Sequence, residues 1–255
     1  MRKKGFPKAR VATFDICDVG QRRHHIPALI EVDVTDGRKR IRELKRGGRR
    51  ISFTAWLLKL IAGTIKDHED VAAFLRGKSE LIIFDDINIS MIVEMSSDGQ
   101  KIPIPFVFQK VQEHSVESIT KQIQDAKSGD LSGVVGTKKL ELLYYYLPGF
   151  LRRLFWRIIL KSPQFAYSKM GNVAVTSLGM MGNANGWFIP ISVHPVCFGI
   201  GKVSKKTKVI EERVEIREIL NITVLMDHDV IDGAQMARFI SDFTRRVESS
   251  NGLDI

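Results

Sequence analysis

The apolar and polar positions of this chain follow two periods, and each period predicts one kind of element. Alternation at every second position, or a short apolar run, is typical of strands and occurs at 28–35, 87–94, 172–179 and 214–226. Apolar spacings of three and four residues are typical of amphipathic helices and occur at 52–68, 115–128 and 236–247. The pattern therefore predicts both strands and helices along the length of the chain.

Local signals refine two of these elements. Ser52 is able to cap the first helix through its hydroxyl. A return strand over 101–107 contains Pro103 and Pro105, which have no backbone N–H to donate to a neighbouring strand. We therefore expect this strand to be irregular or to lie at a sheet edge.

Residues 138–165 have the most unusual pattern. Aromatic and aliphatic side chains over 140–160 are interleaved with Arg152, Arg153 and Arg157. A membrane span is disfavoured, because each charge at the centre of a bilayer costs roughly 2.5–3.5 kcal/mol. The pattern favours an aromatic and basic helical insert, a hairpin that covers a pocket or lies in an oligomer interface. Membrane-surface contact through 140–160 is the alternative.

Composition restricts the classes of protein. With 255 residues, 44% apolar and 27% charged, the chain can bury a full core in one large domain or two small ones. The net charge of +10 suits a polyanion: a nucleotide-containing cofactor, nucleic acid or an anionic membrane surface. Cys17 and Cys197 lie far apart and form no metal-binding spacing, and the N-terminus lacks a secretory pattern, so we expect a cytoplasmic protein.

The clearest candidate chemistry lies between Asp227 and Gly233. His228 falls where a predicted strand gives way to a loop, so a rigid element would support it. Histidine titrates near neutral pH and can take up and return a proton during turnover. Asp232 is able to hold the loop through a salt bridge to a basic partner, and Gly233 permits a backbone turn.

Two other interpretations of this loop stay open. A histidine among aspartates at a turn is often only part of a solvated loop, and local chemistry alone favours that. A metal site would draw on Asp227, Asp229 and Asp232. Their spacing fails the calcium-loop template, which needs its third acidic residue one position earlier and a later glutamate, so we expect no bound metal.

A second candidate is the hydroxyl pair Thr176 and Ser177, at the end of the strand over 172–179. Acyl transfer needs a base that activates the attacking thiol or alcohol, and a donor that holds the developing oxyanion. His228 and one of the two hydroxyls are able to supply these functions. Hydroxyl residues at strand ends are common, so spacing alone does not establish the pairing.

The sequence Asp-His-x-Val-Ile-Asp-Gly-Ala over 227–234 resembles the C-terminal motif of the 2-oxoacid dehydrogenase acyltransferases, the E2 catalytic domains. Chloramphenicol acetyltransferase (CAT) shares its His-x-x-x-Asp-Gly core. Residues 25–35 look like the family's opening strand, 87–105 like its central hairpin, and 175–182 like its Thr-Ile-Ser-Asn-Leu-Gly-Met-Phe-Gly segment. The resemblance implies a CAT-like α/β fold, a two-layer α+β sandwich in which helices cover a mixed sheet, over a single domain spanning 1–255.

In that family a histidine acts as general base on the thiol of coenzyme A or of a dihydrolipoyl group, in an active site between the subunits of a homotrimer. The resemblance implies that His228 is this base, that Asp232 supports it, and that Thr176, with Ser177 beside it, stabilises the oxyanion. It also implies an N-terminal arginine paired with the aspartate, for which Arg10 stands at about the right distance. Acyl-CoA is then a substrate, and no nucleic acid partner is expected.

Three features depart from the family pattern. Asp229 stands where these acyltransferases usually have arginine, and its negative charge would favour the protonated form of His228. The sequence shows no lipoyl attachment site, so a separate lipoyl-bearing protein would supply that group. The insert over 138–165 would reshape the acceptor channel. A non-catalytic CAT-like trimeric scaffold or membrane-surface adaptor, with a decayed site, is therefore the alternative to an enzyme.

Overall fold

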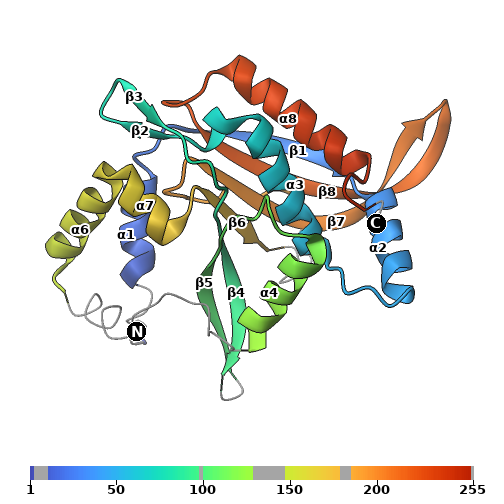
Figure 1. The fold of residues 1–255 in the computed structure, drawn as a ribbon, viewed down its shortest axis with the longest axis horizontal. Helices are drawn as coiled ribbons and strands as arrows, with labels where there is room; N and C mark the ends of the chain where they lie inside the picture. The colour runs from blue at the N-terminus through green and yellow to red at the C-terminus, as the bar shows by residue number, and fades with distance from the viewer. Residues whose placement is uncertain (3–10, 98–99, 129–146, 179–184, 254–255) are drawn as a thin grey trace.

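The computed structural model of the chain describes residues 1–2, 11–97, 100–128, 147–178 and 185–253. A central sheet crosses the molecule, and helices pack against it (Figure 1). The sheet therefore decides where the chain's loops and candidate side chains lie.

The strands of the central sheet are β1 His25–Asp33, β4 Ile89–Ser97, β5 Gln100–Phe108, β6 Val173–Ser177, β7 Val196–Ile210 and β8 Arg213–Asp227. In space their order is β1-β8-β7-β6-β4-β5. β6 runs parallel to both β4 and β7, whereas the other neighbours are antiparallel, so the sheet is mixed. A separate hairpin joins β2 Phe74–Arg76 to β3 Glu80–Ile82.

One face of the sheet is covered by α2 Thr35–Arg46, α3 Phe53–Asp67, α4 Val116–Ser128 and α8 Gly233–Glu248 (Figure 1). Helix α3 is apolar on most sides and lies at the centre of this layer, where Trp56 is fully buried. Phe198 of β7 lies 5.4 Å, between ring centroids, from Phe243 of α8. These contacts fix the C-terminal helix against the strands that precede it, as expected from burial of large aromatic side chains.

The predicted elements are present with shifted ends, except that 214–226, predicted to form two strand-like stretches, is one continuous strand, β8. Ser52 caps α3 by accepting the Ala55 N–H at 3.1 Å, as predicted, and the proline-containing β5 is an edge strand. The first strand was expected to run to residue 35 but ends at Asp33. The Asp33 carboxylate accepts hydrogen bonds from the backbone N–H and hydroxyl of Thr35 at 3.0 and 2.6 Å, which turns the chain into α2.

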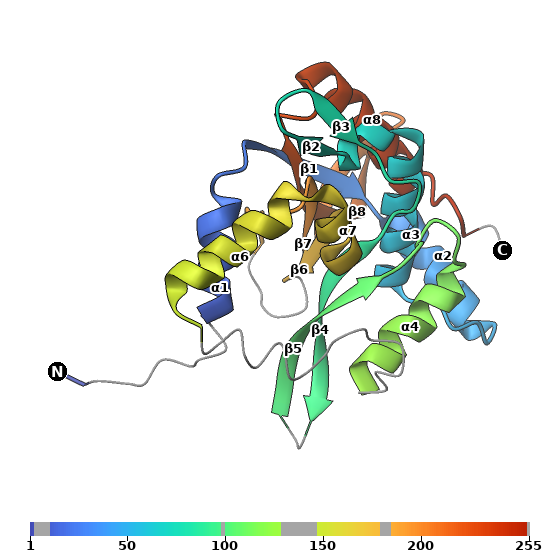
Figure 2. The same cartoon turned by 60° about the vertical axis from the view of Figure 1, so that its left-hand side comes forward.

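The predicted insert over 138–165 contains α6 Gly149–Lys161, and a second helix, α7 Pro163–Met170, begins in its last three residues. Helix α6 lies beside α1 Val11–Gly20, away from the layer that covers the sheet (Figures 1 and 2). Residues 138–146 of the insert lie outside the described residues. In the described part of the chain, none of the helices has both the length and the apolar composition needed to cross a bilayer.

Gly171 lies between the end of α7 and the start of β6. Its φ of 74° lies in the left-handed region, and an added Cβ would stand 2.3 Å from the carbonyl oxygen of Asn88. Only glycine permits this close approach without strain. The turn places β6 directly after α7 and beside β4.

Candidate active site

Backbone hydrogen bonds to two other segments fix the start of the loop that carries His228. The His228 N–H donates to the carbonyl oxygen of His24 at 3.0 Å, and the Asp227 N–H donates to that of Pro195 at 3.0 Å. The imidazole of His228 itself is exposed, and among the described residues it has no hydrogen-bond partner. A fixed backbone with a solvent-accessible ring suits a side chain that acts on a bound molecule.

Asp227 anchors this loop through a buried ion pair. Its carboxylate is 1% exposed, and Arg23 Nη1 lies 2.9 Å from its Oδ2. Antiparallel pairing of His25 with Asp227 brings the residues before β1 to the end of β8. No local sequence signal identifies Arg23, because the pairing depends on strand register; Arg10, the arginine that the resemblance suggests, lies outside the described residues.

Asp232 has a structural part that the sequence interpretation did not predict. It is the N-cap of α8: its Oδ1 accepts the Gln235 N–H at 2.9 Å, and Gln235 Oε1 accepts the Asp232 N–H at 3.0 Å. Within the described residues Asp232 forms no ion pair. A reciprocal capping box satisfies two N–H groups that the helix itself leaves unpaired, and so fixes the end of the histidine loop.

Gly233 is the first residue of α8, and the structure does not give it the turn-forming part predicted for it. It is absent from the residues with positive φ, and an added Cβ would meet nothing within 4 Å. Neither backbone strain nor crowding therefore requires glycine there in this chain.

Asp229, the residue that departs from the family motif, pairs with His24. Both carboxylate oxygens lie 2.9 Å from His24 Nδ1, and this hydrogen bond together with the charge of Asp229 raises the pKa of His24. The pair is exposed. The Asp229 carboxylate thus points to a second histidine of the neighbouring segment.

Thr176 and Ser177 end β6, and both are half-buried. Thr176 pairs with Gly199 of β7, which pairs with Thr223 of β8, five residues before His228. At ~3.4 Å per strand residue, this register places Thr176 roughly 17 Å from His228 along the sheet. The structure therefore does not bring the two predicted catalytic residues together within one chain.

Thr176 lies on the sheet face opposite the helix layer, since its neighbour Val175 faces the core. On the same face, an added Cβ at Gly199 would stand 3.2–3.3 Å from Phe188 and Pro190, so the segment around them crosses this face. The side-chain oxygens of Asn221 and Thr223 are buried without a hydrogen-bond partner in the described structure. Buried polar atoms without hydrogen-bond partners are uncommon, so this face of the sheet is a candidate for contact with another molecule.

Two other histidines make structural contacts: His25 is half-buried and His194 is buried. The His25 side chain contacts the carbonyl oxygen of His194 at 2.9 Å, and burial lowers the pKa of His25. His194 Nε2 lies 3.0 Å from the carbonyl oxygen of Met170, and burial lowers the pKa of His194 to about 4. Both are structural contacts between β1, the segment before β7 and the end of α7.

His194 is expected to make the fold sensitive to acid. Burial lowers its pKa from 6.5 to about 4, so the unfolded state takes up the proton first as pH falls. The associated stability is fully present above pH 6.5 and is lost on the way to pH 4, by about 3 kcal/mol. Urea unfolding between pH 7 and 4.5 measures this loss. His194→Gln, which retains a donor towards Met170, should flatten the dependence; equal slopes in both proteins would contradict it.

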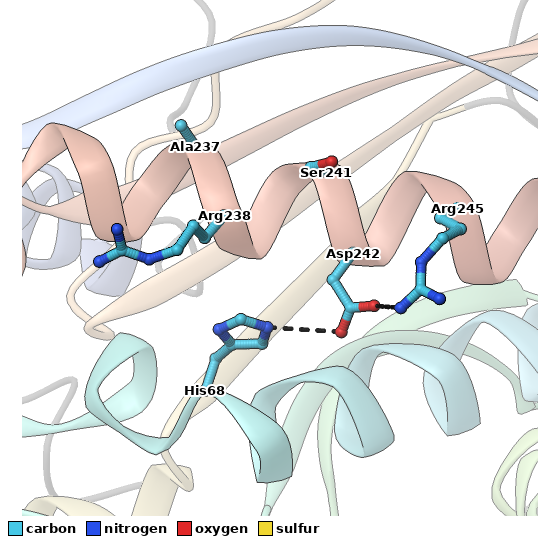
Figure 3. Close-up of a pocket in the computed structure, with 6 residues that line it drawn as sticks. All are labelled: His68, Ala237, Arg238, Ser241, Asp242 and Arg245. Atoms are coloured by element: carbon cyan, nitrogen blue, oxygen red, sulfur yellow. Dashed lines mark hydrogen bonds and ion pairs between the residues drawn. The ribbon is translucent and has the colours of Figure 1, made fainter.

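The surface also has a shallow hollow of about 570 Å³ beside α8, lined by His68, Ala237, Arg238, Ser241, Asp242 and Arg245 (Figure 3). Figure 3 shows His68 and Arg245 pointing to Asp242, with His68 Nε2 3.4 Å from Asp242 Oδ2. Asp242 thus pairs with both side chains, and its contact with His68 joins the end of α3 to α8. Among the described residues, no group of three or more His, Cys, Asp or Glu side chains could hold a metal ion.

The class to which this mixed sheet and its helix layer belong is that of acyltransferase catalytic domains. The chain belongs to the family of 2-oxoacid dehydrogenases acyltransferase (catalytic domain), whose profile matches residues 21–137 and 164–254. The predicted family is confirmed. The match omits 138–163, nearly the whole of the predicted insert.

Similar proteins agree with this assignment. The dihydrolipoyllysine-residue acetyltransferase component of the pyruvate dehydrogenase complex of Mycoplasma genitalium is 24% identical over 208 residues, 80% of this chain and 45% of the relative. The chain thus spans less than half the length of that relative.

Two solved structures share the fold. The cubic core of the pyruvate dehydrogenase multienzyme complex has a TM-score of 0.69 at 16% identity, covering 100% of this chain and 95% of that one. Azotobacter vinelandii dihydrolipoamide acetyltransferase has a TM-score of 0.70 at 16% identity, with the same coverage. The predicted fold, a CAT-like α/β domain with a mixed sheet, is confirmed.

Proposed function

We propose that the chain is a coenzyme-A-dependent acyltransferase that moves an acyl group between coenzyme A and a dihydrolipoyl-type thiol or another small acceptor. The observation that carries this proposal is the exposed His228 on a loop that the backbone and a buried ion pair hold in place. His228 acts as general base. The hydroxyl of Thr176, with Ser177 next to it, holds the oxyanion.

The chemistry needs no further group. The imidazole of His228 takes the proton of the attacking thiol, and the thiolate sulfur forms a bond to the acyl carbonyl carbon. The resulting tetrahedral oxyanion accepts a hydrogen bond from a hydroxyl donor. When the bond to the original sulfur breaks, the leaving thiolate takes the proton back from the imidazolium. Coenzyme A is a substrate throughout.

Residue spacing supports these roles. The work on the Azotobacter vinelandii enzyme concerns the part of a serine, a histidine and an asparagine in its catalytic mechanism; the serine precedes the histidine by 52 positions and the asparagine follows it by four. Thr176 precedes His228 by 52 positions, and Asp232 follows His228 by four. Threonine offers the same hydroxyl donor as serine. The capping box suits Asp232 to a positioning part beside the base.

The active site is proposed to lie between subunits of a homotrimer, because Thr176 and His228 are far apart within one chain. The face opposite the helix layer supports this assembly. The segment that crosses it exposes large apolar side chains, Trp187, Ile189 and Ile191. Exposed apolar patches of this kind mark interaction surfaces. A second copy would bring a hydroxyl from one subunit to the base of its neighbour.

Acyl exchange between acetyl-CoA and dihydrolipoamide tests the proposal directly. Free coenzyme A and acetylated acceptor are separated by chromatography and followed with time. Transfer that depends on His228 supports the enzyme. Absence of transfer together with absence of coenzyme A binding, measured by calorimetry, would reject it and favour the non-catalytic scaffold.

Mixed oligomers are expected to restore activity if the site is shared. Thr176→Ala and His228→Ala homo-oligomers should each be nearly inactive. When the two are unfolded and refolded together in equal amounts, about one quarter of the sites in a cyclic trimer would combine an intact hydroxyl with an intact base. Activity at about one quarter of the wild type, measured with acetyl-CoA, would support the shared site. A mixture no more active than its parents would contradict it.

A further inference from the structure

Helix α6 turns its apolar side to solvent. Phe150, Leu154 and Ile158 are 63%, 49% and 59% exposed, and Leu151 and Phe155 beside them are exposed as well. An amphipathic surface helix normally buries such residues against the core. Of the whole helix, only Ile159 is fully buried among its described side chains. The outward face of α6 therefore consists of large apolar side chains.

The opposite side of α6 fixes this orientation. Arg152 Nε lies 2.7 Å from Oδ2 of the buried Asp15 in α1, and Arg152 Nη1 donates to the carbonyl oxygen of Leu147 at 2.6 Å. Ile159 packs in a small cluster with Phe74 and Ala166. Rotating the helix to bury its apolar face would break this buried ion pair, which is costly when one partner is left unpaired.

Positive charge lies beside the apolar face. Arg153, Arg157 and Lys161 are exposed, and no carboxylate of the described chain lies within ion-pair distance of them. The sequence contains no Asp or Glu from residue 148 to residue 170. Arginine and lysine flanking an apolar helix face complement an anionic lipid surface, where the apolar groups enter the interface and the cations meet phosphate.

The composition of α6 suits an anionic lipid surface. Over Gly149–Lys161 the helix contains only glycine, apolar and basic residues, with no Ser, Thr, Asn, Gln, Asp or Glu. Without an acidic side chain in the helix, the positive charge of Arg153 and Arg157 favours an anionic surface. The helix also lies within 138–163, the stretch that the family profile does not match.

We infer that α6 docks this protein on an anionic phospholipid bilayer. Phe150, Leu154 and Ile158 enter the boundary between headgroups and acyl chains, while Arg153 and Arg157 contact lipid phosphates. The helix lies in the plane of the surface and carries the domain on its other side. This inference is independent of the proposed acyl transfer, because none of the α6 residues on which it rests has a part in that reaction; Figure 2 shows α6 beside α1.

Vesicle co-sedimentation with the full chain tests the docking. Wild-type protein is expected to bind phosphatidylcholine vesicles containing 30% phosphatidylserine, and to bind pure phosphatidylcholine far less. Leu154→Ser/Ile158→Ser should lower the partition coefficient at least about tenfold. Arg153→Gln/Arg157→Gln should lower it about fivefold per charge, and high salt should weaken wild-type binding.

Matched controls come from β8, where Val214 and Ile216 are 72% and 70% exposed, more than Leu154 and Ile158 of α6. Val214→Ser/Ile216→Ser should bind vesicles as the wild type does. Binding that fails with wild-type protein, or that persists in both α6 variants, overturns the inference. If the α6 variants instead change the oligomeric state measured by light scattering and wild type ignores vesicles, the face is an interface between copies.

Discussion

Replacing His228 by alanine is expected to lower acyl transfer by about 10²- to 10⁴-fold, the usual contribution of a general base. The substitution should leave the fold intact, because the imidazole is exposed and has no hydrogen-bond partner in the described structure. Initial rates with acetyl-CoA and dihydrolipoamide, together with the thermal unfolding midpoint, measure both effects. Coenzyme A binding should persist in the variant.

His24→Ala is the control for this experiment. His24 lies next to the histidine loop and pairs with Asp229, so its loss perturbs the same segment without removing the proposed base. This variant is expected to keep most of the rate. If the two variants lose activity equally, or if His228→Ala keeps wild-type activity, His228 is not the base.

Arg23→Ala is expected to destabilise the protein by about 3–5 kcal/mol, because it leaves the buried Asp227 carboxylate without its counter-ion. Activity should fall as well, since Asp227 holds the start of the histidine loop. Urea unfolding at pH 7 gives the stability and the acetyl-CoA assay gives the rate. The loss should exceed that of Arg23→Lys, which keeps the charge.

Arg22→Ala provides the matched control, because Arg22 is adjacent, carries the same charge and is exposed. Its effect on the free energy of unfolding should stay within about 0.5 kcal/mol. Equal effects of the two alanine substitutions would show that the buried ion pair does not anchor the loop.

The sequence predicted the positions of the main strands and helices well where the period was regular. The stripe of apolar residues through 236–247 became the buried side of α8, and Ser52 became the cap of α3. Such signals are local, because a helix or strand face repeats along a few residues. Element ends were less well predicted: the first strand ended early because of a side-chain hydrogen bond to Thr35.

The candidate site was predicted only in part. The motif identified the histidine loop and the family, but not the contacts that hold the loop. Arg23 pairs with Asp227, a residue about 200 positions away in sequence, and this contact exists only because β1 and β8 are antiparallel neighbours. The capping part of Asp232 was also missed, although Gln235 three residues later carries the capping-box signal.

The sequence by itself determined the family, the positions of several strands and helices, and the identity of the candidate base. These follow from short motifs and local periods, which can be recognised without knowledge of distant contacts. Only the tertiary structure decided which arginine meets Asp227, that Thr176 and His228 lie apart, and which side of α6 faces solvent. Each of these three features depends on strand register or on packing between segments remote in sequence. The residues around one position do not show which distant residue it will contact.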